Sequence, residues 1–190
     1  MDRQECQIYL GNAMLRNVCG CVACDDGEMM GESYHCIQNY DQMPPFFMSV
    51  VSSSDHWLFI SSTGGLTAGR INAESALFPY TTDDKITENY ANTGHVAVLL
   101  VTRSGRTILW EPFGDCTASS YRIERNLYKS VYGDKLVFEE INHDLNLRYC
   151  YAWRTSDRFG FVMTAWIESS SPETCTIEVL SGLQNVLPYG

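Results

Sequence analysis

The sequence lacks several features that mark common classes of protein. It has no apolar run as long as a membrane-spanning helix, and its first residues, Met-Asp-Arg-Gln-Glu-Cys, contain no apolar signal core. No Asn-x-Ser/Thr glycosylation sequon occurs. Basic residues are few, since 13 Lys and Arg stand against 23 Asp and Glu for a net charge of −10. These absences argue against a nucleic-acid or membrane partner and predict a cytoplasmic protein.

The sequence also lacks the motifs of phosphate-binding and catalytic sites. Gly64-Gly65-x3-Gly69 has neither the spacing nor the following helix of a P-loop or dinucleotide loop. Glycosidic cleavage needs a positioned carboxylic acid and a second carboxylate or an external phosphate. The neighbours Glu139 and Glu140 would point to opposite faces of a strand, and Lys85 offers Asp83 and Asp84 a local ion pair. We therefore predict no catalytic residues and no complete active site in these 190 residues.

Eight cysteines are present, and without a secretion signal we expect free thiols rather than disulfides. Five residues invite a zinc interpretation because thiolate and imidazole groups suit a closed tetrahedral site. Their spacing is irregular, however, and no second Cys-x2-Cys follows. In the other interpretation the cysteines alternate with valines along a strand and are buried as small apolar side chains. The five candidates are Cys19, Cys21, Cys24, His35 and Cys36.

Short strand patterns recur along the chain, with turn residues every eight to twelve positions. The clearest alternation places Leu145, Leu147, Tyr149, Tyr151 and Trp153 on one strand face. Ser104-Gly105 predicts a hairpin between 95–102 and 107–110. Segment 121–132 is ambiguous, because its cations at 122, 125 and 129 have helical spacing but its aromatic and β-branched residues also allow an extended segment. These cations could form a solvated face or a phosphate-binding cluster. The pattern predicts a single all-β domain, an antiparallel β-sandwich. Further strands are expected at 46–51, 57–62, 136–138, 159–167 and 174–180.

Residues 55–86 combine a predicted strand with a long irregular loop. The Gly64-Gly65 pair ends the strand, and Gly69 permits a close approach or a left-handed kink. Aromatic rings stack on the C–H face of a pyranose, while guanidinium and carboxylate groups bind vicinal hydroxyls. Two alternatives remain: Trp57 as a core aromatic, and Arg70 as a buried partner of the two aspartates. The predicted ligand-binding residues are Trp57, Arg70, Asp83 and Asp84.

Several segments together resemble the N-terminal region of bacterial proteins related to cellobiose phosphorylase. The resemblance covers about residues 45 to 190, whereas residues 1 to 45 carry no match. It rests on Gly-Gly-Leu-Thr-Ala-Gly-Arg-Ile-Asn (64–72), Ala-Leu-Phe-Pro-Tyr (76–80), Thr-Asp-Asp-Lys-Ile (82–86), Leu-Trp-Glu-Pro-Phe (109–113), residues 121–129, residues 138–145 and residues 182–190.

The resemblance implies a sandwich of the galactose-mutarotase-like, super-sandwich kind, smaller here than the full family domain. It also implies a longer polypeptide in which a linker and an (α/α)6 barrel follow, the barrel carrying the catalytic acid and holding the sugar and inorganic phosphate as co-substrate. The chain would then be the non-catalytic N-terminal domain of a glycoside phosphorylase or hydrolase-like enzyme. It would support the barrel, contribute sugar contacts and make dimer contacts. The alternative is a free-standing carbohydrate-binding or protein-interaction module.

Overall fold

The computed structural model describes residues 8–10, 13–15, 23–29, 31–82, 85–88 and 90–187. Within these ranges the chain forms fourteen strands, one helix of four residues and three 3-10 turns. Every strand pair is antiparallel. The prediction of an all-β, antiparallel sandwich-type fold is therefore confirmed. No helix in the described part of the chain has the length and apolar character needed to cross a membrane.

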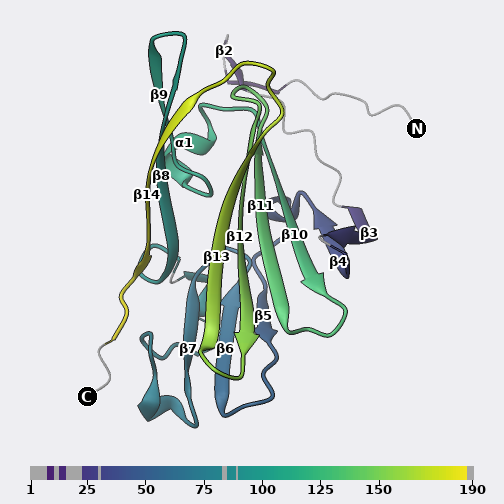
Figure 1. The fold of residues 1–190 in the computed structure, drawn as a ribbon, viewed down its shortest axis with the longest axis vertical. Coiled ribbons are helices and arrows are strands. Elements are labelled where there is room, and N and C mark those ends of the chain that lie inside the picture. The colour runs from purple at the N-terminus through teal and green to yellow at the C-terminus, as the bar shows by residue number, and fades with distance from the viewer. Residues whose placement is uncertain are drawn as a thin grey trace.

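The strands form one large sheet and three smaller ones (Figure 1). The six-stranded sheet has the order β13 (Gly160–Ser169), β12 (Leu147–Ser156), β11 (Lys135–Asn142), β10 (Ile123–Ser130), β4 (Glu32–Gln38) and β3 (Ala23–Met29). One three-stranded sheet contains β5 (Phe47–Val50), β6 (His56–Ser61) and β7 (Leu66–Arg70). The other contains β14 (Thr176–Gln184), β8 (Gly94–Arg103) and β9 (Arg106–Trp110). A separate hairpin pairs β1 (Ile8–Leu10) with β2 (Ala13–Leu15).

Short turns of helix connect these strands. The 3-10 turns are η1 (Tyr40–Gln42), η2 (Ala73–Ser75) and η3 (Ile86–Glu88), and the helix α1 spans Asp115–Ala118. The β8–β9 hairpin turns at Ser104-Gly105, where both residues have positive φ. That pair of left-handed residues is the geometry that two-residue hairpin turns require, so the sequence prediction of this hairpin is confirmed.

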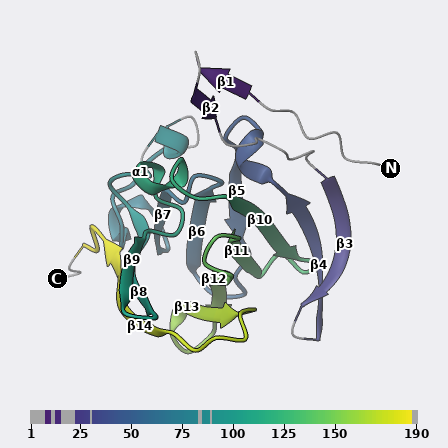
Figure 2. The same ribbon diagram turned by 90° about the horizontal axis from the view of Figure 1, so that it is seen from above.

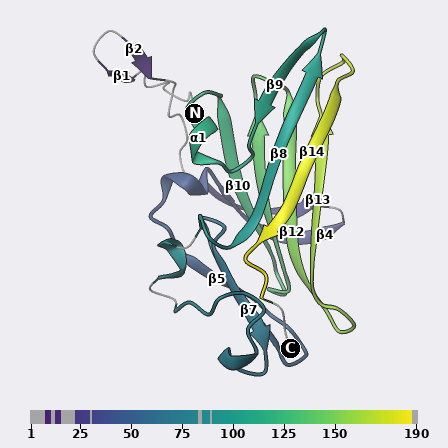
Figure 3. The ribbon, with the colours of Figure 1, turned by 90° about the vertical axis from the view of Figure 1, so that its left-hand side faces the viewer.

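The six-stranded sheet packs against both three-stranded sheets, which share the opposite layer (Figures 1 and 3). The five alternating residues of segment 145–153 all face this layer and are all buried. They meet the inner faces of β5–β7 at one end and of β8 and β9 at the other. Burial of these large side chains is the main stabilising contribution to the fold. Core residues from the opposite layer include Met48, Val50, Leu58, Ile60, Leu66, Leu99, Val101 and Trp110.

The second face of the six-stranded sheet is also partly buried. Figure 2 shows the sheet curving from β13 through β10 to β3. On this outer face Tyr34, Val137, Cys150 and Ala152 form a small cluster, against which Tyr128 and other partly buried side chains pack. The sheet therefore has a major apolar core on one face and a smaller mixed cluster on the other.

The stretch 55–86 differs from its prediction as one long loop after Gly64-Gly65. The chain turns at Gly64, which has a φ of 89°, and returns at once as β7, paired with β6. Only after Arg70 does an irregular segment begin, held to β7 by a bond from Leu77 N to the Ala68 carbonyl. Gly69 permits this close approach, because a Cβ there would lie 2.5 Å from Trp57 Cζ2 and 2.8 Å from the Ser75 carbonyl oxygen.

Candidate functional site

A cavity of about 220 Å³ lies where the large sheet meets the β6–β7 turn and the turn after β9. Strands β10 and β12 contribute Arg125 and Tyr151 to its wall, and η1 contributes Tyr40 and Asp41. We call it the Arg125 pocket. Its lining residues are Tyr40, Asp41, Met43, Pro45, Ser62, Thr63, Tyr90, Phe113, Asp115, Arg125 and Tyr151.

Arg125 is held in place by a buried carboxylate on the neighbouring strand. Arg125 and Glu140 face each other in the β10–β11 register, and Arg125 Nε donates to Glu140 Oε2 at 2.8 Å. Glu140 also accepts from Trp110 Nε1 at 2.9 Å and from the Phe113 backbone N–H at 2.7 Å. The Arg125 side chain is 12% exposed and that of Glu140 only 2%. Three donors therefore satisfy the buried carboxylate, and the guanidinium reaches the pocket already oriented.

The charge of Arg125 is maintained despite its burial. Burial by itself lowers the pKa of the guanidinium, but the neighbouring Glu140 charge, with Tyr40 and Asp41, outweighs that effect and raises it. Arg125 is thus a permanent cation whose charge is compensated by Glu140.

Phe113 forms an aromatic wall from a left-handed backbone conformation. It follows Pro112 in a turn closed by Gly114 N to the Glu111 carbonyl at 3.0 Å, and its φ is 63°. A bulky residue rarely adopts positive φ, and such conformations are found where the surroundings impose them. Here the bond from its N–H to Glu140 and the edge-to-face contact of its ring with Tyr151, at 5.1 Å, hold the residue.

Two buried tyrosines complete the aromatic surroundings. The ring of Tyr151 stacks on Phe138 with centroids 4.8 Å apart, and Tyr40 meets Phe138 edge-on at 6.0 Å. Burial raises the pKa of Tyr40 and of Tyr151 well above the ordinary value for tyrosine. Both hydroxyls therefore stay protonated at neutral pH and can donate as well as accept hydrogen bonds.

The rim of the pocket is acidic and polar. Asp41 and Asp115 are exposed there, beside Ser62 and Thr63. Although Asp41 keeps contact with solvent, partial burial raises its pKa above the ordinary 3.8, while the Arg125 charge acts in the opposite direction. The described lining residues thus include two aspartates and one guanidinium whose charge Glu140 compensates, so the pocket carries an excess of negative charge.

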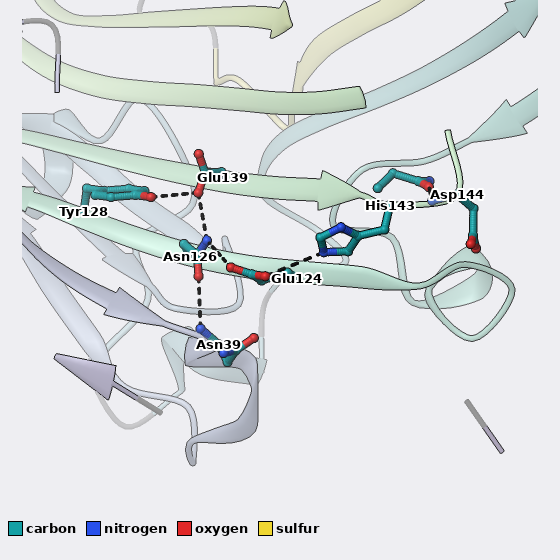
Figure 4. Close-up of polar contacts among 8 residues, drawn as sticks. Asn39, Glu124, Asn126, Tyr128, Glu139, His143 and Asp144 are labelled. Atoms are coloured by element: carbon teal, nitrogen blue, oxygen red, sulfur yellow. Dashed lines mark hydrogen bonds and ion pairs between the residues drawn. The ribbon is translucent and has the colours of Figure 1, made fainter. Parts of the chain in front are cut away.

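Glu139, on the other face of β11, is part of a second network of polar contacts (Figure 4). It accepts from Tyr128 Oη at 2.7 Å and from Asn126 Nδ2 at 2.8 Å, and Arg148 Nε lies 3.1 Å from its other oxygen. Glu139 and Glu140 are therefore both buried, one on each side of β11, as the alternation of a strand predicts.

Asn126 links this outer network to the pocket wall. Its Oδ1 accepts from the backbone N–H of Asn39 at 3.2 Å. Asn39 has a φ of 53° and immediately precedes η1, which carries two lining residues of the Arg125 pocket. Asn126 Nδ2 also donates to Glu124, whose second oxygen lies 3.6 Å from His143 Nε2 (Figure 4). Glu140 therefore positions Arg125 and Phe113 directly, and Glu139, through Asn126, is linked to the start of η1.

The residues predicted to bind ligand do not form one cluster in the described part of the chain. Trp57 is half-buried on β6, where its ring contacts Phe59 and Tyr80 at 6.0 Å each. Arg70, at the end of β7, is exposed and pairs in register with His56, so it lies on the opposite face from Trp57. Asp83 and Asp84 lie outside the described residues. Arg70 as a buried partner of these aspartates stays a prediction that the described residues do not test.

The zinc interpretation can be compared with the structure only in part. His35 and Cys36 are consecutive residues of β4 and point to opposite faces, His35 bonding Asp26 Oδ1 at 2.6 Å and Cys36 being buried. Cys24 lies in β3, opposite Ile37 of β4. Cys19 and Cys21 lie outside the described residues. Among those described, no group of three or more His, Cys, Asp or Glu side chains could hold a metal ion.

The extended alternative for segment 121–132 is the correct one, because residues 123–130 form strand β10, while the phosphate-binding cluster stays a prediction. Arg125 faces the core beside Glu140, while Arg122 lies exposed before the strand. The pocket residues were missed because they come from six separate parts of the chain. One signal was present: Glu140 continues the inward alternation of Leu136 and Phe138, which marks a carboxylate on a core-facing position.

The fold and the cavity define an antiparallel β-sandwich protein with an aromatic, acidic pocket. A scan against models of known protein families gives no match, and no curated protein matches the sequence. The resemblance to cellobiose phosphorylase relatives therefore stays a prediction. Three of its segments nevertheless converge at the pocket, since they supply Phe113, Arg125 and Glu140.

Proposed function

We propose that the chain is a non-catalytic β-sandwich domain that binds an uncharged carbohydrate in the Arg125 pocket, within a glycoside phosphorylase or hydrolase-like enzyme. The observation that carries the proposal is a guanidinium fixed by a buried carboxylate beside aromatic walls. Carbohydrate sites combine apolar or aromatic surfaces with a few precisely placed polar groups. Arg125 supplies oriented donors, and the rim residues Asp41 and Asp115 supply acceptors for hydroxyl groups.

The charge of the pocket favours an uncharged sugar over an anion. The Arg125 charge is compensated by Glu140, and the two rim aspartates add negative potential. Inorganic phosphate would meet repulsion here that a neutral polyol does not. If phosphate is a co-substrate of the parent enzyme, we place its site on the catalytic barrel and not in this pocket.

A different surface supports a structural role beside a catalytic barrel of the same polypeptide. On one face of β14–β8–β9, apolar side chains stay exposed, with Leu180 at 74% and Val96 at 46%. Leu100 and Leu109 are paired in register on the same face and are also exposed. Contiguous apolar surface of this kind is a common feature of contacts between domains.

The test of sugar binding is calorimetry of the 190-residue chain against a panel of neutral monosaccharides and disaccharides. We expect millimolar or tighter binding, weakened about 10- to 100-fold in Arg125→Lys, because lysine keeps the charge opposite Glu140 but loses the oriented fork. Arg122→Lys, on an exposed residue close to the same strand, should leave the affinity unchanged. If the folded wild-type protein binds none of the sugars in the panel, carbohydrate binding is refuted.

The non-catalytic assignment has its own test. The isolated chain should neither hydrolyse nor phosphorolyse β-linked disaccharides when followed by chromogenic release or phosphate consumption. Turnover above that of a heat-denatured sample would overturn this part of the proposal.

A further inference from the structure

A second concave surface lies on the outer face of β5–β6–β7. It is a groove of about 260 Å³ lined by Phe47, Phe59, Tyr80, Thr81, Thr82 and Ile86. Four aromatic rings are in contact along it: Phe47 with Phe59 at 5.6 Å, Phe59 with Trp57 at 6.0 Å, and Trp57 with Tyr80 at 6.0 Å. Phe47 is 44% and Tyr80 56% exposed, so two ring surfaces remain open to solvent.

The groove and the Arg125 pocket adjoin at the start of β5. Pro45, just before the strand, lines the pocket, and Phe47, its first residue, lines the groove. Only Phe46 separates them, so their Cα atoms lie at most about 7 Å apart. The intervening Phe46 is fixed by its N–H to Ser62 Oγ at 3.1 Å and by Ser62 N to its carbonyl at 2.8 Å.

A second connection ties the floor of the groove to the wall of the pocket. Thr63, which lines the pocket, donates from Oγ1 to the Thr87 carbonyl at 3.1 Å. Thr87 belongs to η3, whose first residue, Ile86, is fully buried at the base of the groove. This hydrogen bond therefore joins the wall of the pocket to the segment that forms the base of the groove.

We infer that the pocket and the groove are consecutive subsites of one site for an unbranched neutral oligosaccharide. The inference rests on the proposed function of the pocket. One terminal sugar occupies the Arg125 pocket, and the following sugars pass over Pro45 and stack on the rings of Phe47 and Tyr80. The chemistry of the groove fits this division, since its described lining residues offer ring faces and threonine hydroxyls and none of them is charged.

The test measures affinity against chain length by calorimetry. The probes are D-glucose, D-galactose, D-mannose and D-xylose, each with its unbranched β-1,4-linked oligosaccharides of two to five residues. For the sugar that binds, we expect an affinity about tenfold higher for the trisaccharide than for the monosaccharide. Phe47→Ala/Tyr80→Ala should reduce oligosaccharide affinity to the monosaccharide level without changing monosaccharide affinity. Arg125→Lys should weaken every member of the series.

The matched control is Tyr132→Ala/Phe159→Ala, which removes two exposed rings from positions that line neither the pocket nor the groove. It should leave the whole series unchanged. Monosaccharide binding without any gain from chain length would overturn the two-subsite inference while leaving the proposed function intact. Equal losses for monosaccharide and oligosaccharides in the Phe47/Tyr80 variant would also overturn it. Absence of binding by every probe would refute both proposals together.

Discussion

Replacing Glu140 with glutamine tests whether the buried ion pair organises the pocket. Glutamine preserves the volume of the side chain but offers one carbonyl oxygen and an NH₂ group in place of two accepting oxygens. Glu140 Oε1 accepts from Trp110, and Oε2 accepts from Phe113 N and Arg125 Nε. In either amide orientation the NH₂ group therefore faces a buried donor, and Arg125 loses its counter-charge.

The expected destabilisation follows from these contacts. Leaving one buried donor unsatisfied costs about 1–3 kcal/mol, and removing one partner of a buried ion pair costs about 3–5 kcal/mol in all. We therefore expect Glu140→Gln to lower the free energy of unfolding by about 3–5 kcal/mol. For a chain of this size each kcal/mol lowers Tm by about 2–4 °C, so Tm should fall by roughly 6–20 °C.

Urea unfolding followed by circular dichroism measures this loss, with a thermal scan for Tm. Glu178→Gln, on an exposed residue of β14, is the matched control and should change stability by less than about 0.5 kcal/mol. Glu139→Gln should cost less than Glu140→Gln, because Arg148 keeps a second carboxylate, Glu168, at 3.3 Å. If Glu140→Gln unfolds within about 1 kcal/mol of wild type, the ion pair does not organise this part of the core.

Three further predictions concern protonation and packing. Burial lowers the pKa of His95 below its ordinary 6.5. Below that pH the unfolded chain therefore binds more protons at this residue than the folded chain does. Stability should therefore fall as the pH drops through about 6.5, and His95→Gln should remove part of that slope in urea titrations. Because burial raises the pKa of Asp41, sugar affinity should weaken as the pH is lowered into the acidic range, and Asp41→Asn should flatten this dependence in calorimetry. Gly69→Ala should lower the free energy of unfolding by about 1–3 kcal/mol, since its Cβ would meet Trp57 and the backbone of Ser75 and Ala76, while Gly182→Ala, where a Cβ meets nothing within 4 Å, should cost little.

The parts of the fold that the sequence predicts are those with a strong local period. In segment 145–153 five apolar residues recur at every second position, four of them in β12, and the burial of one strand face follows directly. The Ser104-Gly105 turn is equally local, because two adjacent residues with positive φ define its geometry.

Strands β7 and β10 depend on contacts that no local pattern contains. Thr67, Ala68 and Gly69 are small and lie beside two turn glycines, so the segment has the composition of a loop. It is a strand because β6 supplies its hydrogen-bonding partner and because the chain at 75–77 packs on it, which small side chains permit. In β10 the cations have helical spacing, and the pairing with both β11 and β4 determines the extended conformation.

The pocket was harder to predict because its walls are distant in sequence. Tyr40 follows β4, and Tyr151 lies in β12. They meet at one cavity because the sheet order places β4 beside β10, on the other side of which β11 and β12 follow. A single sequence shows neither that order nor the partner of Arg125. The one aromatic residue among the predicted ligand-binding residues, Trp57, lies beside the groove and not in the pocket. Its ring contacts Tyr80, which lines the groove.

The two adjacent glutamates of β11 explain why the pocket lies where it does. A buried carboxylate needs several donors, and each face of the strand provides a different set. Glu140 holds Arg125 and the turn at Phe113. Glu139 holds Asn126 and, through it, the start of η1. Neutralising either carboxylate should therefore loosen a different wall of the same cavity. A core built only for stability would be served as well by apolar residues at both positions. Two satisfied carboxylates on consecutive residues hold polar groups in fixed positions on both faces of β11, as the proposed carbohydrate site requires.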